Sequence, residues 1–154
     1  MIPNAYFENL SRLGKEHAAM YKAHEAKKDQ IVADKGWDSP EMDAWYADKK
    51  RLEETNPVVG GIGKAFRAWY WGTTDELELS DYLWEKEVAD FVDTLRKAGI
   101  QTFVFTNSST AVMENIHQLV AAGCTLEGPC TITKKTEKWG EETEETVLGL
   151  RFRL

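Results

Sequence analysis

The sequence predicts an α+β protein, with a helical hairpin and further helices packed on a small mixed β-sheet. The first half places apolar residues at helical spacing, whereas the second half interleaves helical segments with short strand-like stretches. In addition, two helical segments end in Ala-Gly and turn directly into a strand, the glycine supplying the left-handed end of the helix. These patterns indicate a β-α-β unit followed by a C-terminal β-hairpin.

The helical layer is expected over residues 1–73. A seam of apolar positions in alternating steps of four and three predicts one long helix over 6–31. The motif WDSPEM predicts a second helix start, with Asp38 as the cap and a hydrophobic staple between Trp37 and Met42. This helix runs to about Glu54 and forms an antiparallel hairpin with the first.

The remaining helices are predicted from similar signals. After the NPVVGG break, a short helix is expected from about residue 62 to 71. Ser80 is expected to cap a helix over 81–98 that turns Trp84 inward, and another helix spans 110–122. The core side of that last helix is predicted to hold Val112, Met113, Ile116, Leu119 and Val120.

The strands belong to the second part of the chain, residues 74–154. Residues 100–106 are nearly all apolar, as in a strand buried on both faces, and 124–127 is expected beside it in parallel after a right-handed crossover. Gly128-Pro129 interrupts that strand. Residues 130–135 should pair with the terminal VLGLRFRL, with GEETEE as the loop of the hairpin. We expect one domain over 1–154, because no linker divides the chain.

Composition excludes several classes of protein. No stretch approaches the roughly 20 apolar residues of a membrane span, and the N-terminus lacks the pattern of a leader peptide. Two cysteines are too few for a disulfide scaffold or a four-cysteine zinc site. We therefore expect a cytoplasmic protein without metal or cofactor.

The net charge of −7 comes entirely from one segment, the acidic stretch of residues 74–93. On either side of it, acids and bases balance. Such a stretch repels phosphate backbones, which argues against direct nucleic-acid binding, and it would attract a basic protein. The candidate partner-binding residues are Glu78, Asp81, Glu85, Glu87, Asp90 and Asp93. The alternative is a solvated face whose first acids stabilise a helix N-terminus.

The tetrad Asn107, Ser108, Ser109 and Thr110 joins a strand to a helix, where α/β proteins often hold anions. It has no glycine or adjacent cation, so helix capping is the competing interpretation. The run KAFRAWYWG offers Lys64, Arg67 and Trp69 as further ligand-binding candidates, although core packing explains its aromatic residues equally well. GGIGKA lacks the Walker spacing and is interpreted as a flexible turn.

No catalytic or metal-binding pattern emerges. His17 and His24 lie about 10 Å apart along one helical face, which is too far for direct ligation of one metal ion. His117 has no acidic or nucleophilic neighbour in sequence. A structural role is therefore predicted for all three histidines, and we assign no catalytic residue.

The phrases DTLRKAGIQTF, TNSSTAVMENIHQLVAAGC, LRFRL and KGWDSPEMDAWY resemble a family of small uncharacterised proteins carried on conjugative and other mobile elements of gut Firmicutes. The resemblance implies a bacterial cytoplasmic accessory protein and transfers no catalytic residues. Mobile elements also carry small acidic inhibitors of host defence, of the anti-CRISPR and antirestriction kinds.

Two functions are therefore expected. The first is a non-enzymatic accessory protein that binds a basic protein partner through the acidic stretch, in one version a nucleic-acid-binding defence protein. The second is a small-anion or nucleotide binder that uses residues 107–110. The sequence leaves the oligomeric state open.

Overall fold

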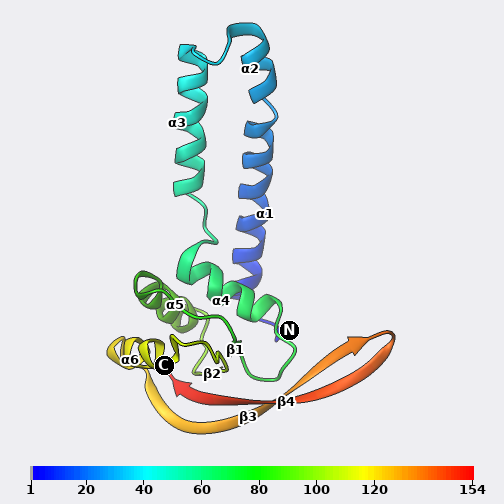
Figure 1. The fold of residues 1–154 in the computed structure, drawn as a ribbon, viewed down its shortest axis with the longest axis vertical. Helices are drawn as coiled ribbons and strands as arrows, with labels where there is room; N and C mark the ends of the chain where they lie inside the picture. Colours follow the sequence, from blue (N-terminus) through cyan, green and yellow to red (C-terminus); the bar gives the residue numbers. More distant parts are fainter. Residues whose placement is uncertain (1) are drawn as a thin grey trace. The chain divides into compact units, whose positions relative to one another are not determined.

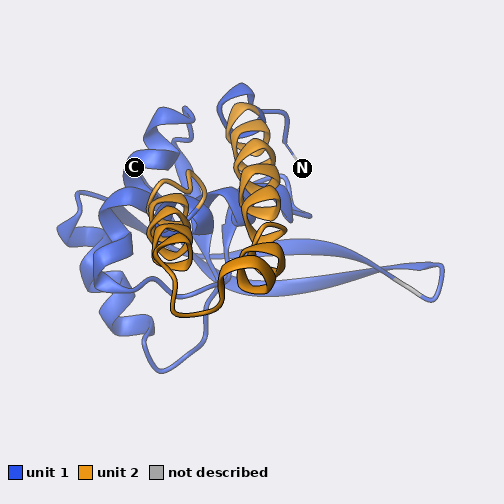
Figure 2. Cartoon of the chain, turned by 90° about the horizontal axis from the view of Figure 1, so that it is seen from above, with its two compact units in different colours: residues 1–8, 59–154 blue, residues 9–58 orange. Residues whose placement is uncertain are grey.

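The computed structural model describes residues 2–154, with Lys138 described by its backbone alone. The described chain contains six helices and four strands, and an α+β fold is confirmed (Figure 1). It forms two compact units, one of residues 9–58 and one that joins the residues up to 8 with 59–154 (Figure 2). These units do not coincide with the predicted halves 1–73 and 74–154, and the prediction of a single domain stays a prediction. None of the described helices combines the length and the apolar character that crossing a membrane requires.

The helical unit contains most of α1 (Ala5–Glu25), together with α2 (Lys28–Lys35) and α3 (Pro40–Glu54). The predicted single helix over 6–31 is wrong, because the chain tightens after α1 into a turn in which the Lys27 N–H donates to the His24 carbonyl. Ser39, and not Asp38, caps α3 by accepting from the Met42 N–H at 3.3 Å. Pro40 at the first helical position places the cap on the residue before it.

Two histidines fasten α1 to α3. The distance from His17 Nε2 to the Leu52 carbonyl is 2.6 Å, and that from His24 Nε2 to the Trp45 carbonyl is 2.9 Å. Trp45 Nε1 donates back to the His24 carbonyl, and the two rings stack. The structural role predicted for both histidines is confirmed.

The predicted hydrophobic staple between Trp37 and Met42 is wrong, since Trp37 is 58% exposed and lies beneath the Lys28 ammonium.

The sheet has the order β1-β2-β4-β3, with β1 (Glu78–Leu79), β2 (Thr102–Phe105), β3 (Thr125–Lys138) and β4 (Glu141–Arg153). β1 and β2 are parallel, and the other two pairs are antiparallel. The predicted parallel pairing of 124–127 with the first strand is therefore wrong, because β4 lies between them. Stacking of Phe152 on Phe103, with ring centroids 5.4 Å apart, accompanies this insertion.

The C-terminal hairpin is confirmed, but its turn lies elsewhere than expected. β3 is one strand that pairs with β4 on both sides of a β-bulge between Leu126 and Gly128, so Gly128-Pro129 does not interrupt it as predicted. The pairing extends to Lys138 and Glu141, so the turn is Trp139-Gly140 and most of GEETEE belongs to β4. Trp139 adopts a positive φ of 59°, and its side chain is fully exposed. The hairpin extends past the rest of the sheet (Figures 1 and 2).

Two helices begin later, or turn differently, than expected. α5 spans Glu85–Lys97, because residues 80–84 form an irregular segment between β1 and the helix, and Trp84 at its cap position is exposed instead of inward. In α6 (Val112–Ala121), the predicted burial of Met113 and Val120 is wrong. The buried Asn115 sets the rotation of α6, since its amide donates to the Leu83 carbonyl and accepts from the Leu83 N–H, both at 2.8 Å.

α4 (Gly60–Tyr70) packs on α5 at very short range. The glycines of GGIGKA lie inside the first turns of α4 and do not form a flexible turn, because α5 leaves no room for a side chain at Gly61. A Cβ atom there would lie 2.0 Å from the Glu87 carbonyl oxygen and 2.7 Å from the Phe91 nitrogen. Phe91 in turn packs edge-on against Phe103 of β2.

Replacing Gly61 with alanine should therefore destabilise the protein by about 3 kcal/mol, because two helix backbones would have to separate. Gly14→Ala in α1 is the control, since its Cβ would approach only the end of the Val58 side chain, at 3.0 Å. Urea unfolding followed by circular dichroism measures both changes. Equal effects of the two substitutions would contradict the close approach of α4 and α5.

Candidate functional site

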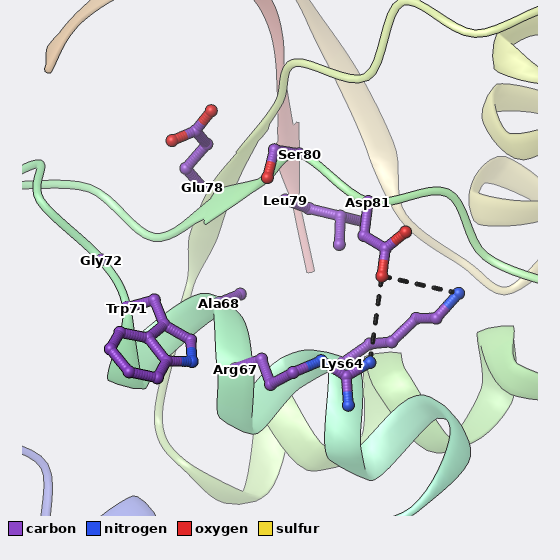
Figure 3. Close-up of a pocket in the computed structure, with 9 residues that line it drawn as sticks. All are labelled: Lys64, Arg67, Ala68, Trp71, Gly72, Glu78, Leu79, Ser80 and Asp81. Atoms are coloured by element: carbon purple, nitrogen blue, oxygen red, sulfur yellow. Dashed lines mark ion pairs between the residues drawn. The ribbon is translucent and has the colours of Figure 1, made fainter.

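A pocket of about 350 Å³ lies between α4 and the end of β1 (Figure 3). From α4 it is lined by Lys64, Arg67 and Ala68, followed by Trp71 at the C-cap and by Gly72. From β1 and the residues after it, it is lined by Glu78, Leu79, Ser80 and Asp81. The α4 residues recur at steps of three and four, so they share one face of the helix. The carboxyl end of β1, which pairs in parallel with β2, supplies the opposite wall.

Lys64 is the most enclosed cation of the pocket, with its side chain 8% exposed. Its ammonium lies 2.9 Å from Glu87 Oε2 on α5, donates to the Tyr82 carbonyl and lies over the Tyr82 ring. Burial raises the pKa of Glu87, but the Lys64 ammonium and the Trp84 N–H outweigh it and hold that pKa below its ordinary value. Lys64 therefore ties α4 to α5 and to the chain between β1 and α5.

Arg67 and Asp81 face each other across the pocket. Asp81 Oδ2 lies 3.9 Å from both Arg67 Nη2 and Lys64 Nζ, distances that are too long for hydrogen bonds (Figure 3). Both side chains are about half exposed, at 52% for Arg67 and 51% for Asp81. Within the described residues, neither side chain is engaged in a hydrogen bond, so a guanidinium and a carboxylate stand side by side with donors and acceptors free.

Glu78, by contrast, is held through one carboxylate oxygen. Its Oε1 lies 2.6 Å from Lys134 Nζ of β3 and accepts from the Thr106 hydroxyl, and its side chain is only 10% exposed. Lys134 comes from the hairpin and Thr106 follows β2, so this ion pair joins three strands at the pocket edge. Glu78 thus contributes to holding the wall of the pocket in place.

The tetrad does not form an open anion cradle. The Ser109 N–H donates to Asn107 Oδ1 at 2.9 Å, and the Ala111 N–H donates to the Ser109 hydroxyl at 3.4 Å. Two N–H groups of the helix entry are thereby capped from within. The Asn107 amide donates to the Ser80 carbonyl at 3.0 Å and so fixes the residue that follows β1. Ser108 and Thr110 are exposed and do not line the pocket.

The other ligand-binding candidates separate into two groups. Lys64 and Arg67 line the pocket together. Trp69 is buried, stacks on Phe7 with centroids 5.2 Å apart, and donates from Nε1 to the Ile2 carbonyl at 2.6 Å. Trp71, which sequence analysis did not single out, takes the exposed position beside the pocket.

Most acids of the acidic stretch are paired with cations, and all of these cations except Lys97 are far away in the sequence. Arg151 forms two hydrogen bonds to the Glu76 carboxylate, at 2.6 and 3.0 Å, and this pairing holds the pKa of Arg151 above its ordinary value. The other ion pairs are Glu78 with Lys134, Asp81 with Lys64 and Arg67, Glu87 with Lys64, and Asp93 with Lys97. Among the described side chains of this stretch, Asp75, Glu85 and Asp90 are in no ion pair.

Glu87, which the sequence suggested as a partner-binding residue, is therefore a buried structural group. The pocket residue Ser80 was expected to be a helix cap. The alternation of Leu77 and Leu79 with polar residues was the available signal for β1 and for the pocket wall.

No three His, Cys, Asp or Glu side chains gather in a metal-ligating arrangement within residues 2–154.

Lys64→Met should lower the free energy of unfolding by about 3 kcal/mol, because it leaves the Glu87 carboxylate without its cation.

Glu87→Gln should also destabilise the folded protein near neutral pH. Because the folded-state pKa of Glu87 is lowered, its contribution is present above its ordinary value of 4.5 and is lost as the pH falls through the lower folded-state value. Urea unfolding at a series of pH values measures this difference. A cost of Glu87→Gln that stays constant into the acid range would contradict the assignment.

Comparison with known proteins gives one family. The model of a domain of unknown function, DUF7698, matches residues 62–154, which include every residue that lines the pocket. No curated protein and no solved structure matches the chain. The match covers more than half of the chain and begins within α4, so the helical unit of residues 9–58 lies outside it. The chain therefore belongs to the DUF7698 family.

Proposed function

We propose that the protein binds a small polar ligand of the nucleoside or nucleotide class in the pocket between α4 and β1. The observation that carries this proposal is the pair Arg67 and Asp81, whose donors and acceptors face the pocket without hydrogen bonds to each other. A ligand with neighbouring donor and acceptor groups satisfies both side chains at once. The volume of about 350 Å³ lies in the range of small-molecule sites.

The position of the pocket supports the same proposal. β1 and β2 are adjacent parallel strands joined through α5, and ligands of α/β sheets commonly bind beyond the carboxyl ends of such strands. Here, Ser80 and Asp81 follow β1 directly. Asn107, which follows β2, holds the Ser80 carbonyl and so connects the two strand ends.

The charges of the side chains that line the pocket restrict the net charge of the ligand. Two cations, Lys64 and Arg67, are matched by two carboxylates, Glu78 and Asp81. A polyanion such as a triphosphate would meet two negative groups, whereas a nucleoside or a monophosphate would not require a net positive site. Because the buried Lys64 and Glu78 are already paired, we propose binding without catalysis.

Nucleosides and nucleoside monophosphates should raise the melting temperature of the full chain. At 100 times the dissociation constant, the ligand adds about 2.7 kcal/mol, or about 5 to 10 °C for a chain of this size. Arg67→Ala should abolish the shift, and Arg12→Ala, on the exposed face of α1, should retain it. If no member of the panel stabilises the unmodified protein at millimolar concentration, the proposal fails.

A second candidate function is a cytoplasmic accessory protein of a bacterial mobile element that binds a basic protein. The observation that favours it is the exposed acidic row along β4, formed by Glu141, Glu142, Glu144 and Glu145, whose side chains alternate between the two faces of the hairpin. None of these carboxylates forms an ion pair with a described side chain. The fully exposed Trp139 lies beside this row at the turn of the hairpin. An inhibitor of a nucleic-acid-binding defence protein is one form of this candidate.

Reversing Glu142, Glu144 and Glu145 to lysine should abolish retention of the protein on a basic partner, because the attractive field changes sign. The matched control reverses Glu8, Glu16 and Glu53, which are acids of the helices. Pull-down from a bacterial lysate at two salt concentrations measures the change. Equal capture by both triple variants would rule out the acidic row as the contact surface.

A further inference from the structure

We infer that the base recognised in the pocket is guanine, an inference that rests on the proposed function. The order of charges along the pocket wall favours guanine. Asp81 presents only acceptors and Arg67 only donors, and their nearest charged atoms are 3.9 Å apart. A base that fits must therefore present two donors beside two acceptors along one continuous edge.

Guanine has this edge. Its 2-amino group and N1–H are neighbouring donors, and O6 and N7 follow as neighbouring acceptors. A carboxylate accepts from the two donors together, and a guanidinium donates to O6 and N7 in the bidentate arrangement known from DNA recognition. The donors of guanine therefore face Asp81, and its acceptors face Arg67.

The other bases match less well. Adenine presents N1 as an acceptor beside its 6-amino donor, so a lone pair would face the Asp81 carboxylate. Uracil and thymine place a single N–H between two carbonyl oxygens, and cytosine offers only one donor group. Each mismatch leaves a polar group of the site without a partner on the base, and this lost pairing is what distinguishes guanine from the other bases.

The rest of the pocket is compatible with a planar ring. Ala68 of α4, which is partly exposed, provides apolar surface beside the charged pair, whereas Leu79 of β1 is only 1% exposed and belongs to the core. Trp71 is exposed and lies on the other side of Ala68 from Asp81, where the sugar of a nucleoside would extend (Figure 3). Lys64 already forms an ion pair with Glu87 and a hydrogen bond to the Tyr82 carbonyl, so Arg67 is the cation that can bind the base.

Nucleoside titrations of the full chain test the inference. By calorimetry, guanosine should bind at least about tenfold more tightly than inosine, which lacks the 2-amino group, and more tightly than adenosine. This comparison uses the unmodified protein and so does not depend on the folding of any variant. Equal affinities for guanosine, inosine and adenosine would overturn the guanine assignment and leave the proposed function standing. Absence of binding by every nucleoside and nucleotide would overturn both.

Asp81→Asn supplies a test by gain of binding. Xanthine carries a carbonyl where guanine carries the 2-amino group, so an asparagine amide can donate to that carbonyl and accept from N1–H. The variant should therefore lose affinity for guanosine by at least about tenfold and prefer xanthosine. Asp90→Asn, the same change on an acid of α5 outside the pocket, should leave the preference for guanosine intact. A preference that is unchanged in Asp81→Asn would overturn the assignment of Asp81.

Discussion

The buried ion pair of Lys64 and Glu87 is the interaction on which the arrangement of the sheet-containing unit depends. It joins α4 to α5, while the same ammonium binds the Tyr82 carbonyl in the segment that leaves β1. The absence of a side chain at Gly61 lets the two helices approach closely enough for this contact. Since an ion pair at this depth is stable only when both partners are present, one lysine determines the helix packing and one wall of the pocket together.

The ion pairs show that the acidic stretch is not a uniformly negative surface. A run of acids in the sequence suggests a negative surface, but Glu76, Glu78 and Glu87 are each bound by a cation from another element. Their charges serve to connect β1 and α5 to the hairpin and to α4. Within the acidic stretch, Asp75, Glu85 and Asp90 have no ion pair with a described side chain, so these three are the acids of the stretch that could attract a partner from a distance.

The family match and the structure divide the chain at nearly the same place. The matched residues 62–154 contain the sheet, α5, α6 and the whole pocket, whereas the helical unit is held together by contacts of its own. In that unit, His17 and His24 each contact a carbonyl of α3, and His24 also stacks on Trp45. All the residues that line the pocket thus lie within the matched segment, and the helical unit of residues 9–58 lies outside it.

By itself, the sequence determined the α+β class, the antiparallel helices, the two Ala-Gly joints and the C-terminal hairpin. Each of these follows from local periodicity, from a glycine at the end of a helix or from alternation within one segment. Only the tertiary structure decided that β4 lies beside β2, that Asn115 sets the rotation of α6, and that Arg67 faces Asp81. These features join residues that are distant in the chain, and no local pattern specifies which distant strand or charge becomes the partner. The pocket belongs to this second class, because it exists only where α4 and β1 meet.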